Sequence, residues 1–219
     1  MTGNPSAEPE DWTEVGILPS DPAQQDPLLL DVIDPLINDT LSERIESWHF
    51  FWEVDPLYWK DDPAPMRHLR LRVLWRPGQG EAGRAELTRY LDEAETAGGL
   101  WRWYPSNNGI PGEEYEGEAA GYDGPEMWRV TYRDWRAGSD LSLALVKLED
   151  AGRLAKGRQY HLERRVHLHS NRLGLSYRDE GTLYLGLAIG YMELAGLSGD
   201  GMDTLRGLKD SLDKLPPVP

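Results

Sequence analysis

The segment HLHSNRLGLS, residues 167–176, concentrates side chains that can move protons or donate hydrogen bonds. Two of the five histidines in the chain, His167 and His169, lie two positions apart in it. Histidine is the side chain best suited to proton transfer near neutral pH. In a helix His167 shares a face with Asn171, four residues on, whereas His169 lies about 200° from His167. The segment is therefore either a reactive site or a helix end that meets solvent or a neighbouring helix.

A metal centre is not indicated by these histidines. His167 and His169 lack the i, i+4 spacing of a helical zinc site, and no third ligand is clearly placed. The chain has no cysteine, which excludes disulfides, thiolate zinc sites, iron–sulfur clusters and cysteine nucleophiles. Neither a nucleotide-binding glycine loop nor a serine-elbow motif occurs.

A second group of candidate residues lies in RHLRLRVLW, residues 67–75, which alternates as a strand does. One face of this strand is apolar: Leu69, Leu71 and Val73. The other is basic: His68, Arg70 and Arg72. Arg70 and Arg72 lie about 7 Å apart along the strand and repel each other unless an anion or a carbonyl-rich peptide lies across them. The alternative is an exposed sheet face paired with local acids, because the chain has 38 acidic residues.

The overall charge limits the partners. With 23 basic residues against 38 acidic ones, the net charge is −15, which argues against nucleic-acid and anionic-membrane binding. No apolar run reaches the roughly 20 residues of a membrane span, and the N-terminus MTGNPSAEPEDW is polar and acidic, unlike a signal peptide. We expect a cytoplasmic protein.

The order of the elements predicts an α+β fold, with a small mixed sheet from the N-terminal half and a helical C-terminal half. Residues 1–26 are expected to form a flexible tail, followed by a single domain over residues 27–215. Strands are predicted at residues 48–54, 67–75 and 100–104. Helices are predicted at residues 27–47 (interrupted at Pro35), 81–99, 125–136, 139–155, 158–173, 180–197 and 201–214. Residues 105–124 are expected to form a long loop, and Gly138-Ser139-Asp140 to break a helix with Ser139 as the cap.

Four segments, in order, resemble the C-terminal domain of class I lantibiotic dehydratases, which also occurs as a stand-alone thiopeptide-type bacteriocin biosynthesis protein. They are WHFFWEVDP…RHLRLRV, EYEGEAAGYDGPEMW, RDWRAGSDLSLAL and HLHSNRLGLS. Together they cover residues 48–176, and the later helices also fit.

The resemblance implies action on a ribosomally synthesised precursor peptide by one of two chemistries. Eliminases remove glutamate from glutamylated Ser or Thr. Pyridine synthases join two dehydroalanines by a formal aza-[4+2] cycloaddition, with loss of water and leader peptide. Eliminases usually carry an Arg before their Tyr-Gly-Gly sequence, whereas this chain has Gly121 followed by Tyr122, Asp123 and Gly124. The missing cation favours a cofactor-independent pyridine synthase; an eliminase and a non-catalytic peptide-docking module remain the alternatives.

The resemblance also implies roles for particular residues. Arg70 or Arg72 would stabilise negative charge on an amide oxygen, and His167 would transfer protons, with Ser170 and Tyr177 as hydrogen-bond donors. The substrate-binding candidates are Trp48, Trp52, Trp101, Trp103, Asn171 and Arg172. The four tryptophans are expected to line a peptide cleft, with a Trp-rich core as the alternative. The expected partners are the precursor peptide, as leader plus dehydrated core, and other biosynthetic enzymes.

Overall fold

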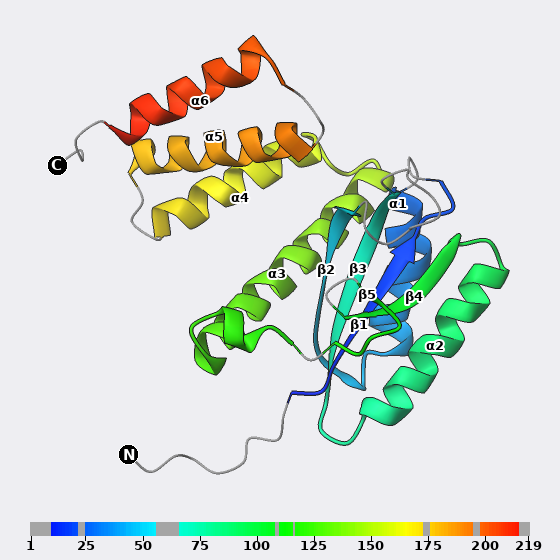
Figure 1. Cartoon of the computed structure of the whole chain (residues 1–219). Coiled ribbons are helices and arrows are strands. Elements are labelled where there is room, and N and C mark those ends of the chain that lie inside the picture. The colour runs from blue at the N-terminus through cyan, green and yellow to red at the C-terminus, as the bar shows by residue number, and fades with distance from the viewer. Residues whose placement is uncertain are drawn as a thin grey trace, which may run out of the picture. The chain divides into compact units, whose positions relative to one another are not determined.

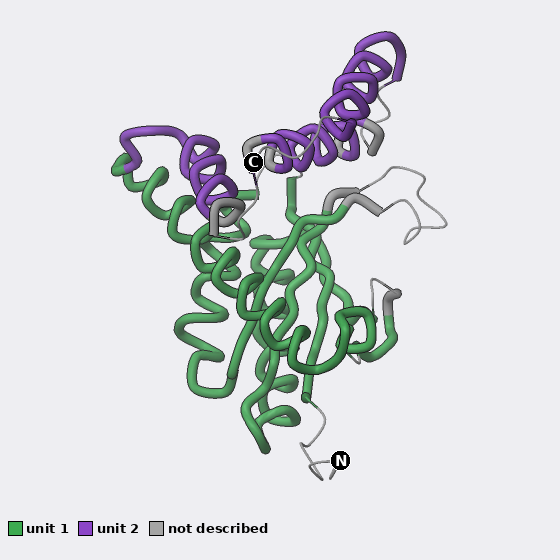
Figure 2. The backbone as a smooth tube through the Cα atoms, turned by 90° about the vertical axis from the view of Figure 1, so that its left-hand side faces the viewer, with its two compact units in different colours: residues 1–153 green, residues 154–219 purple. Residues whose placement is uncertain are grey.

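The computed structural model describes residues 10–21, 25–55, 66–107, 110–115, 117–172, 176–194 and 198–214. The chain divides into two compact units, residues 1–153 and 154–219, coloured separately in Figure 2. Each unit is considered by itself. The single domain expected over residues 27–215 spans parts of both.

The first unit is built on a five-stranded sheet in the order β2-β3-β1-β4-β5 (Figure 1). The strands are β1 Trp12–Leu18, β2 Ile45–Asp55, β3 Met66–Trp75, β4 Arg102–Asn107 and β5 Ile110–Pro111. Every strand pair in it is antiparallel. The α+β class is confirmed, and the expectation of a mixed sheet is corrected to an antiparallel one.

Strand β1 lies inside the segment that was expected to be a tail. It occupies the middle of the sheet between β3 and β4, where Glu14 pairs with Arg72 and Ile17 with Leu69. The tail prediction is therefore wrong for residues 12–18. The local signal is a short alternation among proline-rich and acidic neighbours. This segment becomes a strand because it pairs with β3 on one side and β4 on the other.

The helices follow the expected helical periodicity closely. Unit 1 contains α1 Gln25–Pro27, the π-helical turns η1 Leu28–Ile33 and η2 Leu36–Thr40, α2 Gly80–Thr96, the 3-10 turn η3 Ala119–Gly121 and α3 Pro125–Asp150. Unit 2 contains α4 Arg158–Arg172, α5 Tyr177–Leu194 and α6 Asp200–Asp213. The helix expected over residues 27–47 is shorter than expected, because β2 already begins at Ile45.

Helix α3 continues without interruption through Gly138 and Ser139, so the predicted break there is wrong. It packs beside the edge strand β2 (Figure 1). The Ser139 hydroxyl lies 3.0 Å from the Trp135 carbonyl oxygen and accepts a 3.0 Å hydrogen bond from the Phe50 backbone N–H. Ser139 therefore attaches α3 to the sheet edge instead of capping a new helix.

The sheet has one apolar and one polar face. The apolar face packs against η1, η2 and α2, with Leu143 and Val146 of α3, and forms the main core. The polar face is partly covered by Tyr115 and by residues 117–135, whose aromatic side chains pack on Trp12 and Leu74. Apolar and polar side chains alternate along β3 with the two-residue period of a strand, although both faces are buried there.

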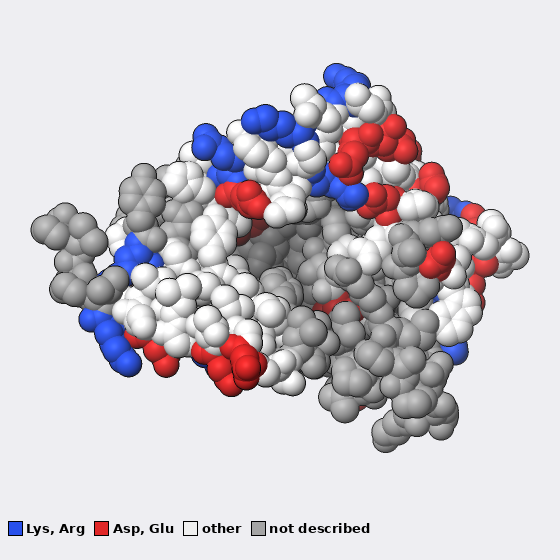
Figure 3. Space-filling view, turned by 90° about the horizontal axis from the view of Figure 1, so that it is seen from above, with Lys and Arg blue, Asp and Glu red and all other residues white. Residues whose placement is uncertain are grey.

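The surface is of mixed charge. Lys and Arg side chains are interspersed with Asp and Glu on the face drawn in Figure 3. Among the helices of the described part of the chain, none combines the length and apolar character that crossing a membrane requires.

Two glycines test how tightly each helix is packed against its neighbours: Gly83 in α2 and Gly138 in α3. A Cβ at Gly83 would lie 2.4 Å from the buried Trp75 ring, whereas a Cβ at Gly138 would meet nothing within 4 Å. We expect Gly83→Ala to lower the free energy of unfolding by about 1–3 kcal/mol through overpacking. Gly138→Ala should raise it by roughly 0.5–1 kcal/mol, since alanine favours a helix. Urea unfolding of both variants is the measurement, and equal changes would contradict this account of the packing.

Candidate active site

The polar face of the sheet carries a buried cluster of charged side chains. As expected from the alternation of β3, His68, Arg70 and Arg72 lie on the face opposite the core residues. These three side chains are nevertheless buried, at 2%, 5% and 2% exposure. The alternative expectation was an exposed sheet face paired with local acids. It is wrong about the exposure and right about the acidic partners.

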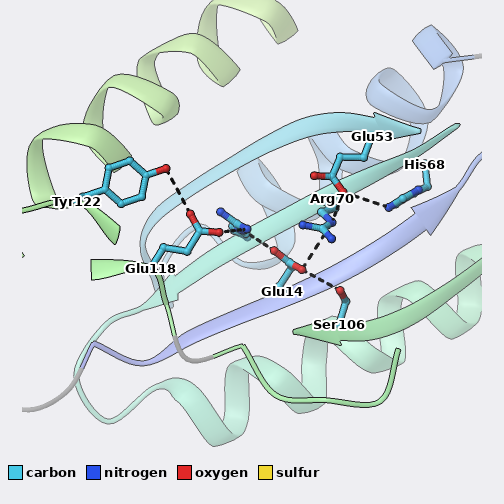
Figure 4. Close-up of polar contacts among 8 residues, drawn as sticks. Glu14, Glu53, His68, Arg70, Ser106, Glu118 and Tyr122 are labelled. Carbon is cyan, nitrogen blue, oxygen red and sulfur yellow. Dashed lines mark hydrogen bonds and ion pairs between the residues drawn. The ribbon is translucent and has the colours of Figure 1, made fainter. Parts of the chain in front are cut away.

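Glu14 lies at the centre of this cluster (Figure 4). Its Oε2 accepts a hydrogen bond from Arg72 Nε, in the pair that joins β1 to β3. Its Oε1 accepts a 2.8 Å hydrogen bond from the Ser106 hydroxyl of β4 and lies 3.9 Å from Arg70 Nε. The Glu14 side chain itself is fully buried, so a carboxylate is held by donors from two other strands.

The two arginines have further acidic partners. Arg72 Nη2 donates a 2.7 Å hydrogen bond to Glu118 Oε1, from the segment before η3. Arg70 Nε lies 2.7 Å from Glu53 Oε2 of β2, and His68 Nε2 lies 3.9 Å from the same oxygen. Figure 4 shows Glu53 between His68 and Arg70, and Glu118 beside Tyr122, whose hydroxyl lies 3.5 Å from Glu118 Oε2.

The cluster is close to electrically balanced. Two guanidinium groups are surrounded by three carboxyl groups, from Glu14, Glu53 and Glu118. With the carboxyl groups ionised and His68 neutral, the sum is one negative charge. Buried ions are stable only when they are paired and hydrogen-bonded, which this arrangement achieves.

Aromatic rings enclose the Arg72 guanidinium. Its carbon lies 4.8 Å from the Phe51 ring centre, 4.5 Å from that of Tyr115 and 5.9 Å from that of Trp135. Such contacts stabilise a cation that has lost its water. Burial by itself lowers the pKa of Arg72, but the charge of Glu14 and the hydrogen bonds to Glu14 and Glu118 raise it above its ordinary value.

His49 is an unusual neighbour of Arg72. It pairs with Arg72 across β2 and β3, is fully buried and lies among the rings of Trp12, Phe51 and Trp135. Burial, followed by the charge of Arg72, lowers the pKa of His49 to about 3. Within the described part of the protein neither of its ring nitrogens has a hydrogen-bond partner. His49 is thus a neutral, desolvated imidazole at neutral pH.

The four tryptophans proposed to line a cleft do not lie with the arginines. Strand alternation places Trp48 and Trp52 on the apolar face, since they pair with Val73 and Leu69. Trp103 pairs with Ile17 on that same face, and Trp48 is fully buried in the core. Trp101 precedes β4 and is 49% exposed. The Trp-rich core is the better description of Trp48, Trp52 and Trp103.

The other predicted site residues lie in unit 2. The HLHSNR stretch belongs to α4, as its periodicity predicted, and His167 is half-buried there. Ser170, Asn171 and Arg172 follow in the same helix, and Tyr177 begins α5. The side chains of these four residues and of His169 lie outside the described ones. The catalytic role expected of His167, as of Arg70 and Arg72, stays a prediction.

Several residues of the cluster were not found from the sequence: Glu14, His49, Glu53, Ser106, Tyr115 and Glu118. Tyr115 and Glu118 had a local signal, as the two ends of the Tyr-x-x-Glu pattern in the segment EYEGE. Glu14 lies 58 residues from Arg72 along the chain, and Ser106 lies 92 residues from Glu14. Within the described ranges no three His, Asp or Glu side chains converge as metal ligands.

Of two cavities that open among the described residues of unit 1, the smaller borders the cluster. The smaller cavity, of about 480 Å³, lies beside the first residues of β1 and residues 112–115, and it borders Glu14 and Tyr115. It is lined by Glu10, Asp11, Trp12, Thr13, Glu14, Arg84, Pro105, Gly112, Glu113, Glu114 and Tyr115. The larger, of about 820 Å³, lies between β3 and α3 and includes Glu46, Arg129 and Arg133.

Comparisons with known proteins agree with this architecture. The family model described as "Lantibiotic biosynthesis dehydratase C-term" matches residues 12–164. The tRNA-dependent lantibiotic dehydratase MibB from Microbispora sp. 107891 has a TM-score of 0.50 at 20% identity, over 68% of this chain and 13% of MibB. TsrL has a TM-score of 0.47 at 19% identity, over 90% of this chain and 53% of TsrL. The chain thus spans less than two thirds of either protein, and the MibB match shows a common fold. The comparison with curated proteins found no match.

The buried imidazole should make stability depend on pH. Unfolded His49 takes up a proton below about pH 6.5, whereas folded His49 does so only near pH 3, so stability is lost as the pH falls between these values. Between pH 7 and pH 5 this loss should be about 2 kcal/mol for the wild type and absent from His49→Phe. The measurement is urea unfolding at both pH values, with His161→Gln as the control for loss of one imidazole. If the free energy of unfolding fell equally between pH 7 and pH 5 in the wild type and in His49→Phe, the loss could not be assigned to His49.

Proposed function

Because the chain belongs to the lantibiotic biosynthesis dehydratase C-terminal family, we propose that it modifies a ribosomally synthesised precursor peptide and closes a pyridine macrocycle on it. The reaction is a formal aza-[4+2] cycloaddition between two dehydroalanines. Loss of water and of the leader peptide then completes the aromatic ring. The observation that carries this proposal is the charge balance around Arg70 and Arg72.

An eliminase has to hold the carboxylate of a glutamyl group. Here Arg70 and Arg72 already have the carboxyl groups of Glu14, Glu53 and Glu118 beside them. A fourth carboxylate would meet like charges in a buried setting, which is strongly unfavourable. The reacting groups of a pyridine synthase are uncharged, so they suit a site in which the cations are already neutralised.

The same residues can serve amide tautomerisation, the step that creates the 2-azadiene. It needs a donor at the amide oxygen and a base for the amide N–H. Arg72 or Arg70 would donate an N–H group to the oxygen as negative charge develops there. Glu118, which is hydrogen-bonded to Arg72 and whose side chain is 27% exposed, is a candidate base.

His167 is proposed to carry protons in tautomerisation and in the loss of water and leader, with Ser170 and Tyr177 as donors nearby. Asn171 and Arg172 would hold the substrate or the helix end. Most of the acceleration would come from holding two distant dehydroalanines in a reactive pose.

Elimination is the second candidate, favoured by the Arg70, Arg72 and Tyr-x-x-Glu matches to the family. Three peptides separate the functions: a leader-bearing peptide with two dehydroalanines, the same peptide with glutamyl-Ser, and one with neither. Loss of leader plus water from the first supports pyridine formation, and loss of glutamate from the second supports elimination. Binding of all three without a mass change would mean a docking module and would overturn both.

Replacement of either arginine by lysine should slow the reaction. A lysine keeps the charge but not the planar fork, so Arg70→Lys and Arg72→Lys should each lower kcat with the bis-dehydroalanine peptide by about 100-fold. Arg72→Lys should also lose about 1–3 kcal/mol of stability, because two hydrogen bonds and three ring contacts depend on the guanidinium. Arg89→Lys, on the exposed side of α2, is the control. If both variants converted the peptide at the wild-type rate, a catalytic role of Arg70 and Arg72 would be ruled out.

The two histidines of α4 should differ in their effect on turnover. His167→Ala should lose most activity, by about 100-fold, as expected for a proton-transferring group, with little change in melting temperature. His169→Ala should do less damage, because it lies about 200° around the helix. The measurement is turnover of the bis-dehydroalanine peptide beside a melting curve for each variant. Equal activities of the two variants would mean that the HLHSNRLGLS segment has only a structural role.

A further inference from the structure

Glu14 is placed as a bound ligand would be. Its two carboxylate oxygens face three donor groups: Arg72 Nε, the Ser106 hydroxyl at 2.8 Å, and Arg70 Nε at 3.9 Å. Two guanidinium groups and a hydroxyl are the donors that proteins commonly use to bind a small carboxylate. In this protein the carboxylate is supplied by the chain itself, from the central strand β1.

The Glu14 side chain is fully buried, but the residue borders a cavity. Glu14 is 2% exposed, yet it forms part of the wall of the cavity of about 480 Å³. The same cavity is lined by other acidic residues, among them Glu113 and Glu114. A small molecule in this cavity would lie next to the residue that carries the buried carboxyl group, and shortening the Glu14 side chain would leave space between them.

Removal of the Glu14 carboxyl group would uncover donors that remain held by other residues. Arg72 would still be fixed by Glu118 and by the rings of Phe51 and Tyr115, and Arg70 by Glu53. Two guanidiniums would then face two carboxyl groups. The cluster would change from one net negative charge to neutral and would hold an empty space the size of a carboxylate.

We propose that Glu14 is a built-in occupant of a carboxylate-binding site formed by Arg70, Arg72 and Ser106, and that it determines specificity by keeping anionic substrate groups out. The selection of uncharged peptide groups rests on the function proposed above. The occupancy of the site by Glu14 does not, and it can be tested without any turnover.

The test is rescue of Glu14→Ala by formate, followed by thermal unfolding at constant ionic strength with chloride as the balancing anion. Saturating formate should raise the melting temperature of Glu14→Ala by about 5 °C, because a ligand that binds only the folded state stabilises it. The wild type and Glu14→Gln should shift by about 1 °C or less, since a side chain already fills the space in both. Formamide, which is similar in size and uncharged, should not rescue the alanine variant.

Formate rescue can also be measured if Glu14→Ala folds poorly. If Glu14→Ala is largely unfolded in chloride, formate should restore its folded fraction, measured by tryptophan fluorescence, whereas chloride and formamide should not. Equal shifts in all three proteins, or no shift in Glu14→Ala with either readout, would overturn the proposal.

A second arm addresses specificity. Glutarate, which has the carbon chain and the free carboxylate of a glutamyl group, should inhibit conversion of the bis-dehydroalanine peptide by Glu14→Ala at least about tenfold more strongly than conversion by the wild type. Equal inhibition would overturn the role of Glu14 in selection. If the wild type does not convert that peptide at all, the proposed function fails, and the formate experiment still decides whether Glu14 occupies a carboxylate site.

Discussion

The structure of the first unit depends on one buried contact, between the Glu14 carboxylate and the Arg72 guanidinium. Removing both charges from water costs several kcal/mol for each ion, and a single pair rarely recovers this cost. Further partners offset this cost. Ser106 donates to Glu14, and Glu118 and three aromatic rings contact Arg72. Each of these partners comes from a different part of the chain, so the contact requires the whole sheet and its cover to be in place.

This contact explains why β1 must occupy the centre of the sheet. Only there does Glu14 lie opposite Arg72 on one side while β4 brings Ser106 to the other. The segment before α3 is held in turn, because Glu118 bonds Arg72 and the rings of Tyr115 and Tyr122 pack with the aromatic cluster on Trp12. These contacts hold Tyr115, Glu118 and Tyr122 over the polar face.

The neutralised arginines also bear on the chemistry. A guanidinium that lacks a counterion attracts an anion, whereas one that is already paired acts mainly through its remaining N–H groups as a hydrogen-bond donor. The second description agrees with a site for peptide carbonyl groups. His49 lies beside Arg72 as a neutral ring and adds no charge, and its centroid is 5.6 Å from that of the Trp12 ring.

The sequence by itself determined the periodic features of this protein. The two-residue alternation of β3 placed Arg70 and Arg72 on one face, the 3.6-residue period located α2, α4, α5 and α6, and the four motifs indicated the family. These are local properties, encoded within about ten to twenty neighbouring residues. Only the tertiary structure decided that the arginine face is buried, that Glu14, Glu53 and Glu118 neutralise it, that Ser139 fastens α3 to β2, and that Trp48 belongs to the core. Each of these depends on residues brought together from distant parts of the chain, and a local pattern carries no information about which distant partner will satisfy a buried charge or an open strand edge.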